Sequence, residues 1–286
     1  MKGKSLIEVG LIFLATQLLN WILKPLQFFK DEIALLGWSY TGGLISMVIS
    51  LLVVYVSNTD FKECGFTREG WKFSLDIGFT AWLVWVIPIA AFLILQLSYT
   101  DLFAGLIITG FVFLAILLIL LITKNKDREE FKEEKYKTPF NLIFLTFLLL
   151  VPILLGLYLQ KSANELLLVI STVIWQFIFS GFGEEIRYRG YYQPRVNKEF
   201  GRPYEIMNVN FGLGLFVGAA FFGLSHVFNP FSPFEGIFEL SWGWGLWTFA
   251  AGLFFGILKE KTQNIIAPGV AHGSDAFGEA LMVLFS

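Results

Sequence analysis

The sequence NELLLVISTVIWQFIFSGFGEEIRYRG occupies residues 164–190, where an apolar run long enough to cross a membrane ends in the adjacent acids Glu184 and Glu185. Its continuous Leu, Ile and Phe residues, without period-2 alternation, favour a transmembrane helix over a barrel strand. A charged side chain at the centre of a bilayer costs about 2.5 to 3.5 kcal/mol on insertion scales. The two acids are therefore candidates for function.

The composition of the whole chain is that of a membrane protein. Of the 286 residues, 56% are hydrophobic and only 15% are charged, which predicts an integral membrane protein. The net charge of -2 provides no basic surface, so nucleic acid is excluded as a partner. Cys64 is the single cysteine, which excludes an intramolecular disulfide. The apolar N-terminal run carries Glu8 and lacks a small-residue cleavage site, which predicts a retained first helix.

Apolar stretches of membrane-spanning length recur along the sequence. We expect an all-α, polytopic transmembrane bundle of about eight or nine helices, because only helices or closed barrels satisfy the backbone in lipid. The nine expected spans are Ser5–Lys24, Ile33–Val56, Ile77–Leu97, Ala104–Thr123, Phe140–Gln160, Asn164–Gly183, Phe211–Val227, Ser241–Leu258 and Ile265–Leu284.

The distribution of positive charge predicts an orientation. Most of the 21 lysines and arginines fall in one set of connections, while the opposite set holds only Lys24, Lys30 and Lys161. Cytoplasmic loops are enriched in these residues, so we expect a cytoplasmic N-terminus and Glu184 near the cytoplasmic face. The mixed charges of residues 124–138 predict a solvated cytoplasmic connection.

The spacing around the two acids predicts a different role for each of them. Glu185 and Arg189 are four residues apart with the acid first, the favourable order for a helical ion pair, which leaves Glu184 as a base or ligand. Gly181 and Gly183 would let another backbone approach closely. The alternative is a charged helix end at the cytoplasmic interface.

Both histidines of the chain lie downstream of the acids, in apolar surroundings. His226 ends a stretch rich in glycine and alanine, and His272 lies among small residues with Asp275 shortly after it. A lone intramembrane histidine is commonly a packing residue. Two histidines together with a carboxylate pair indicate a site.

Two kinds of chemistry suit these residues. Glu184, His226 and His272, with Asp275 as a further donor, could bind a divalent metal such as Zn²⁺ and leave one position open for water. Equally, Glu and His could activate water without a metal. The chain contains neither H-E-x-x-H nor G-x-S-x-G, which excludes ordinary zincins and nucleophile-elbow hydrolases.

The motifs resemble those of the CPBP family of intramembrane proteases, which includes CAAX-processing endopeptidases of Rce1 type and bacterial Abi or bacteriocin-immunity proteins. They are E-E-x-x-x-R at residues 184–189, F-x-x-x-H at residues 222–226 and a late histidine, His272. The resemblance covers approximately Asn164 to Leu284. It implies N-terminal transmembrane helices over residues 1–160 and a catalytic helical core over residues 161–286.

The resemblance also implies a role for each residue. Glu184 would activate water with His226, supported by Glu185 and Arg189, while His272 would bind metal or stabilise the oxyanion. The family usually carries Asn four residues after the last histidine, and here that position is Ala276. Asp275, at plus three, could replace the amide as a ligand or orient a histidine. Asn229 is either a polar helper of His226 or part of a helix-ending turn before Pro230.

The expected spans leave a geometric conflict. With Glu184 near the cytoplasmic side, His226 lies about 22 Å along the following span and the two cannot meet. Either the helix of Glu184 continues through Tyr191 and Tyr192, or residues 200–210 lie along the surface and His226 sits shallower. In both arrangements we expect a water-filled cavity that reaches the middle of the membrane.

The predicted function is an intramembrane endopeptidase that cleaves a membrane-associated peptide or protein, in CAAX-like processing or in bacteriocin self-immunity. The alternative is a catalytically silent immunity or scaffold protein of the same fold. A transporter would show two matching halves, which the sequence lacks. We expect a multi-pass protein of a bacterial plasma membrane, with the lipid bilayer as its surroundings.

Overall fold

The computed structural model describes residues 3–57, 59–98, 100–126, 128 and 138–285, and almost all of its regular structure is helical. The α-helices are α1 (Lys4–Leu23), α2 (Gln27–Leu36), α3 (Tyr40–Val56), α4 (Trp71–Ile94), α5 (Leu102–Thr123), α6 (Thr138–Tyr158), α7 (Ala163–Ile174), α8 (Glu185–Arg187), α9 (Gln193–Phe200), α10 (Leu213–Val227), α11 (Trp242–Thr262), α12 (Ile266–His272) and α13 (Asp275–Phe285). The π-helical segments are η2 (Trp175–Glu184) and η3 (Tyr188–Tyr192), and a short 3₁₀ turn, η4, covers Pro233–Glu235. Strands β1 (Tyr204–Ile206) and β2 (Val209–Phe211) form an antiparallel hairpin.

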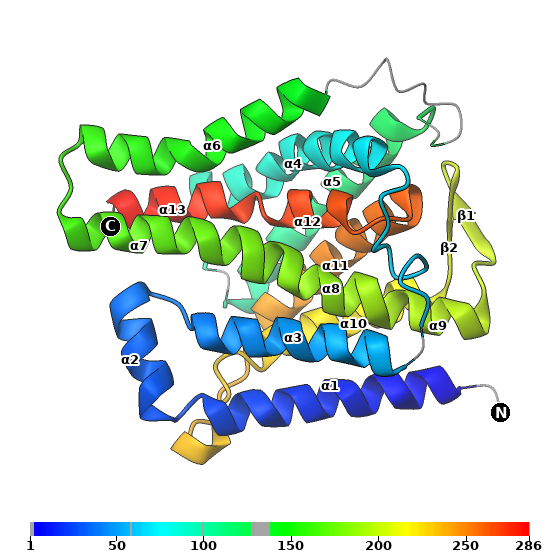
Figure 1. Cartoon of the computed structure of the whole chain (residues 1–286), viewed down its shortest axis with the longest axis horizontal. Coiled ribbons are helices and arrows are strands. Elements are labelled where there is room, and N and C mark those ends of the chain that lie inside the picture. Colours follow the sequence, from blue (N-terminus) through cyan, green and yellow to red (C-terminus); the bar gives the residue numbers. More distant parts are fainter. Residues whose placement is uncertain (1–2, 58, 99, 127, 129–137, 286) are drawn as a thin grey trace.

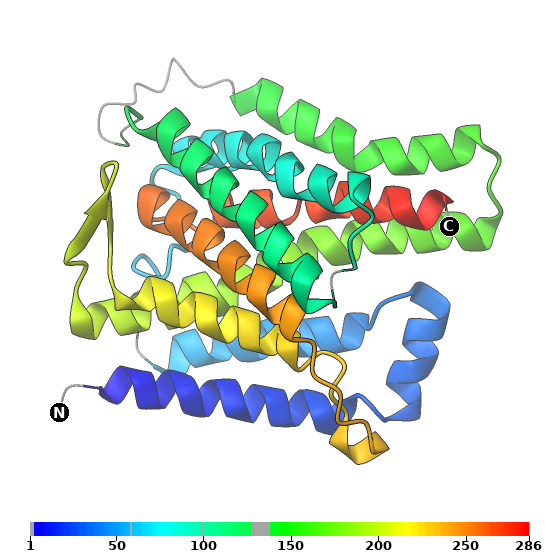
Figure 2. The same ribbon diagram turned by 180° about the vertical axis from the view of Figure 1, so that it is seen from behind.

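The helices form a layered bundle, which confirms the predicted all-α fold. Figure 1 shows α7 to α9 crossing the middle of the molecule as one long rod, between α3 on one side and α12 and α13 on the other. Figure 2, from behind, shows α5, α11 and α10 slanting across the opposite layer. The candidate residues come from this contact between the long rod and the helices behind it.

Fewer helices than the nine expected spans are long and apolar enough to cross a membrane. In the described part of the chain five pass this test: α1, α4, α5, the Pro139–Tyr158 part of α6 and the 38-residue Ala163–Phe200 helix. A sixth span results if α2 and α3, bent by 111°, count as one. The structure thus has several membrane spans, but α10 is short and the last expected span is divided between α12 and α13.

The long helix resolves the conflict between Glu184 and His226. It continues through Tyr191 and Tyr192 to Phe200, which is the first of the two expected arrangements. At 1.5 Å per residue, Glu184 lies about 24 Å before the end of this helix, and His226 about 20 Å after the start of α10. The hairpin joins these two ends (Figure 1), so both residues reach the same depth in the bundle. Glu184 is therefore mid-helix, so the expected end of the span at Gly183 is wrong, while the position of Glu184 relative to the cytoplasmic face stays a prediction.

Local sequence fixes where the long helix begins and ends. Ser162 and Glu165 form a reciprocal capping box at its start. Gly201 follows its end with φ +74°, a left-handed conformation that favours glycine. The capping box and Gly201 therefore mark the two ends of one continuous helix.

Small residues let α10 and α11 pack closely. A Cβ atom on Gly223 would lie 2.7 Å from the carbonyl oxygen of Gly245, and one on Gly252 would lie 2.7 Å from Cα of Ala219. Contacts that short exclude a larger side chain, as at close helix crossings in membranes. The glycine and alanine content of residues 212–223 therefore serves helix packing.

Most of the predicted connection at residues 124–138 lies outside the described residues.

Candidate active site

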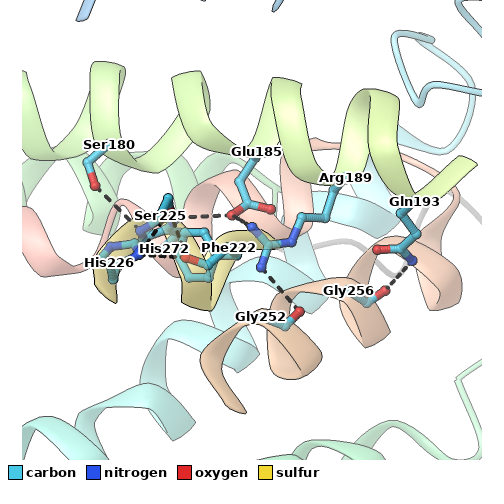
Figure 3. A network of polar contacts seen from close by, with 10 residues as sticks. All are labelled: Ser180, Glu185, Arg189, Gln193, Phe222, Ser225, His226, Gly252, Gly256 and His272. Carbon is cyan, nitrogen blue, oxygen red and sulfur yellow. Dashed lines mark hydrogen bonds and ion pairs between the residues drawn. The ribbon is translucent and has the colours of Figure 1, made fainter. Parts of the chain in front are cut away.

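A stripe of polar side chains runs along the long helix and faces α11. Its members are four residues apart and buried: Glu185, Arg189, Gln193 and Asn197. Arg189 Nη2 donates to the carbonyl oxygen of Gly252 (3.1 Å), and Gln193 Nε2 donates to that of Gly256 (3.0 Å). The two glycines share the same four-residue spacing, so one face of each helix matches the other (Figure 3).

Glu185 is the centre of the buried network. Its Oε1 accepts hydrogen bonds from Arg189 Nη1 (2.8 Å) and from His272 Nδ1 (2.9 Å). The side chains of Glu185 and Arg189 are 0% exposed. The guanidinium also lies 4.5 Å from the centre of the Phe222 ring. The alternative of a charged helix end in water is therefore wrong, because this pair is enclosed by protein.

Several contacts fix the position of the His272 ring. Its ring stacks on Phe255, with centroids 4.6 Å apart and an angle of 14°. Its Nδ1–H donates to Glu185, which assigns the tautomer and leaves Nε2 as an acceptor, 3.4 Å from the hydroxyl oxygen of Ser180. A close approach makes this possible, because a Cβ atom on Gly181 would lie 2.7 Å from Cα of Gly273. Gly181 thus has the predicted close backbone neighbour.

Gly183 does not have that role. An added Cβ atom there would meet only the carbonyl of Ile178 at 3.6 Å and the side chain of Met47 at 4.0 Å. These are ordinary contact distances. Of the two glycines before the acid pair, only the first brings another helix close.

The two ring nitrogens of His226 differ in their contacts. Nδ1 lies 2.8 Å from the carbonyl oxygen of Phe222, so it carries the proton and donates it in this bond. The ring also contacts Trp244, with centroids 5.4 Å apart. Among the described residues no hydrogen bond involves Nε2 of His226. This nitrogen is left as a base or ligand.

Glu184 has an open acceptor. Its Oε2 is buried and has no hydrogen-bond partner in the described part of the chain. Leaving a buried acceptor unpaired costs about 1 to 3 kcal/mol, so a water molecule or a substrate group is the expected partner.

The two other polar candidates, Asp275 and Asn229, do not join this network directly. Asp275 Oδ1 accepts from the indole N–H of Trp85 on α4 (3.1 Å). Ala276, at the position of the family's Asn, is fully buried. Asn229 follows the end of α10, and its carbonyl accepts from Lys24 Nζ (2.9 Å), which fits a helix-ending turn.

A preformed zinc site is not present in the described residues. No group of three His, Cys, Asp or Glu side chains there is placed to hold a metal ion. Glu184 Oε2 and His226 Nε2 are open donors, but the Nδ1 of His272 is engaged by Glu185 and its Nε2 faces Ser180. The arrangement as it stands does not fit three-ligand binding.

Sequence reasoning missed several buried polar partners. Gln193 and Asn197 continue the spacing of Glu185 and Arg189, and that period was the available signal. Ser180 next to His272 carries no such signal. The same is true of Gln176, which donates to Glu279 Oε2 (2.5 Å) beneath the site.

Comparison with known proteins agrees with the motifs. Residues 165–276 match the family model described as type II CAAX prenyl endopeptidase Rce1-like. All five predicted site residues, from Glu184 to His272, lie inside this segment. No curated protein and no solved structure matches the chain. The match is to a protease family, and it spans 112 of the chain's 286 residues.

Proposed function

We propose that this chain is an Rce1-like CAAX protease of the CPBP family, and that it is an intramembrane endopeptidase whose water is activated by Glu184 and His226. One observation carries the proposal. Glu184 Oε2 and His226 Nε2 both lack a hydrogen-bond partner in the described structure, whereas Glu185 accepts from Arg189 and His272 at Oε1 and keeps only its Oε2 unpaired.

The reaction follows from these protonation states. Water held by His226 Nε2 loses a proton to the Glu184 carboxylate while its oxygen bonds to the scissile carbonyl carbon. Glu184 then passes this proton to the amine as the C–N bond breaks. His272 is the proposed oxyanion donor, and it donates from Nε2 only when both ring nitrogens carry a proton, because Nδ1–H is already directed at Glu185. Arg189 holds the Glu185 carboxyl group in place through the hydrogen bond from Nη1.

The predicted zinc ion is a separate part of the proposal. Glu184, His226 and His272 stay its predicted ligands, although their arrangement in the described structure does not fit three-ligand binding, and a bound Zn²⁺ would supply Lewis-acid polarisation and a more acidic water. None of the steps above depends on it. Elemental analysis of purified protein tests it: one equivalent of zinc, lost in both His226→Ala and His272→Ala, supports the metal, and zinc-free active protein contradicts it.

The substrate class is a peptide or protein at the membrane, as in CAAX-like processing or bacteriocin self-immunity.

A catalytically silent immunity or scaffold protein is the second candidate function. Two observations favour it: Ala276 replaces the family's Asn, and Asp275 is turned to Trp85 and makes no hydrogen bond to His272 in the described structure. An anionic side chain is also a poor oxyanion donor.

A cleavage screen separates the two candidates. Purified protein in detergent is incubated with a library of membrane-tethered peptides, and products are identified by mass spectrometry. The protease proposal predicts products with wild type and with the exposed-site control Glu205→Gln, and none with Glu184→Gln. Products that persist unchanged with Glu184→Gln contradict the catalytic role, and no products from any of the three favour the silent protein.

A further inference from the structure

A polar cavity of about 360 Å³ lies away from the acids and histidines, where α11 ends. Its walls come from the segment that follows α5, the segment between α9 and β1, the β1–β2 hairpin and the last turn of α11. Four lining side chains are cationic and one is anionic: Lys126, Arg128, Arg202, Lys261 and Glu260. Asparagines from the hairpin and Gln263 add neutral hydrogen-bonding groups.

The single acid of the lining is already satisfied inside the protein. The side chain of Glu260 is 1% exposed and accepts from Arg202 Nε (2.7 Å). Its other oxygen accepts from Gln193 Nε2 (2.8 Å) and Asn197 Nδ2 (2.6 Å). Glu260 therefore fixes one wall and presents little charge to the cavity.

The cations have capacity for a further partner. Lys126 contacts Asp76 at 2.8 Å, and Arg128 contacts Glu69 at 3.5 Å, and neither acid lines the cavity. An ammonium has three N–H donors and a guanidinium five, more than one carboxylate contact uses. The lining is thus rich in donors that converge from separate elements.

We infer that this cavity binds a phosphate group, either of an anionic phospholipid or of free phosphate. Cations from three elements suit a tetrahedral anion with several oxygens better than a two-oxygen carboxylate. The volume is that of a small-molecule site. The hairpin wall lies at the same end of the bundle as the chain's N-terminus (Figure 1), where basic pockets between helices bind lipid head groups.

The test uses full-length protein in detergent, titrated with phosphatidylglycerol or phosphatidylcholine and read by native mass spectrometry. The variant is Arg128→Gln with Lys261→Gln. Its matched control is Lys62→Gln with Lys198→Gln, which removes the same charge from two exposed residues, one of which also pairs with Glu69. Arg202 is left intact because it holds the buried Glu260.

We expect saturable binding of phosphatidylglycerol, weakened about 25-fold in the variant and unchanged in the control, because each basic residue contributes about fivefold. Arg128→Gln alone, at a partly exposed side chain, should lose about fivefold. Displacement of the lipid by inorganic phosphate, with a raised melting temperature, supports free phosphate as the source. Lipid binding that phosphate does not displace supports the lipid. Equal binding of both lipids without a phosphate effect overturns the inference, as does unchanged affinity in the variant.

Discussion

In the candidate site, the hydrogen-bond partners of each side chain determine which atoms are left to react. Glu185 accepts from both Arg189 and His272 at Oε1 and keeps Oε2 unpaired, whereas no hydrogen bond to the side chain of Glu184 is present in the described structure. The four-residue spacing of Glu185 and Arg189 made their ion pair predictable from sequence. The contact with His272, 87 residues away, was not predictable in its details, because only the packing of α12 against η2 creates it.

Removing the guanidinium should destabilise the protein strongly. Arg189→Gln leaves the fully buried Glu185 without its cation, for which the expected loss is about 3 to 5 kcal/mol of unfolding free energy. Lys161→Gln, which removes an exposed ion pair with Glu165, should cost less than about 1 kcal/mol. Denaturant unfolding in detergent measures both. Equal, small losses in the two variants would show that the buried pair is not stabilising.

Cys64 should be almost unreactive in the folded protein. Its side chain is fully buried in the loop before α4, and burial raises the pKa of the thiol to about 12. The thiolate is the reactive form, so labelling by iodoacetamide at pH 8 should be on the order of 10³ slower than for an ordinary thiol, and should accelerate as the pH rises. Cys64→Ser with Lys62→Cys provides an exposed thiol nearby. Equal labelling rates for the two proteins would contradict the burial.

At the scale of elements, the long helix and its packing partners decide where the site lies. Apolar runs predicted most helices, but a hydropathy window does not show that Asn164–Gly183 continues to Phe200, because the continuation is polar and buried by other helices. The π-helical segments η2 and η3 on either side of α8 were likewise not predicted. Such segments often mark functional positions in helices.

The crossing of α10 and α11 should not tolerate a methyl group. Gly223→Ala places Cβ 2.7 Å from the carbonyl oxygen of Gly245, and overpacking of this kind costs about 1 to 3 kcal/mol. Gly110→Ala in α5 meets nothing within 4 Å and should be neutral or stabilising by up to about 1 kcal/mol. Melting temperatures of the two variants test this. A Gly223→Ala protein as stable as Gly110→Ala would mean that the helices are farther apart.

At the scale of the whole molecule, composition predicted a multi-pass membrane bundle, and the structure agrees. The number of spans was overestimated, because α10 has only 15 residues, the last expected span is divided between the short helices α12 and α13, and α11 is not among the helices apolar enough to cross a membrane. Orientation relative to the cytoplasm stays a prediction from the lysine and arginine distribution.

The two chain ends should lie on opposite sides of the membrane. Figures 1 and 2 both place the N-terminus and the C-terminus at opposite ends of the bundle, with the hairpin near the N-terminus. In inverted membrane vesicles, a protease should remove an N-terminal tag and a thiol reagent should reach Glu205→Cys, while a C-terminal tag is protected. Both tags removed from the same side would contradict the arrangement.

The central claim is that Glu184 carries the proton of the attacking water. Its most direct test is the turnover of Glu184→Gln on one substrate from the screen, at saturating concentration, beside wild type and Glu205→Gln. The amide keeps the shape of the side chain but cannot accept the proton, so we predict that kcat falls about 10² to 10⁴-fold with KM nearly unchanged. A Glu184→Gln protein that keeps the wild-type kcat would contradict the account.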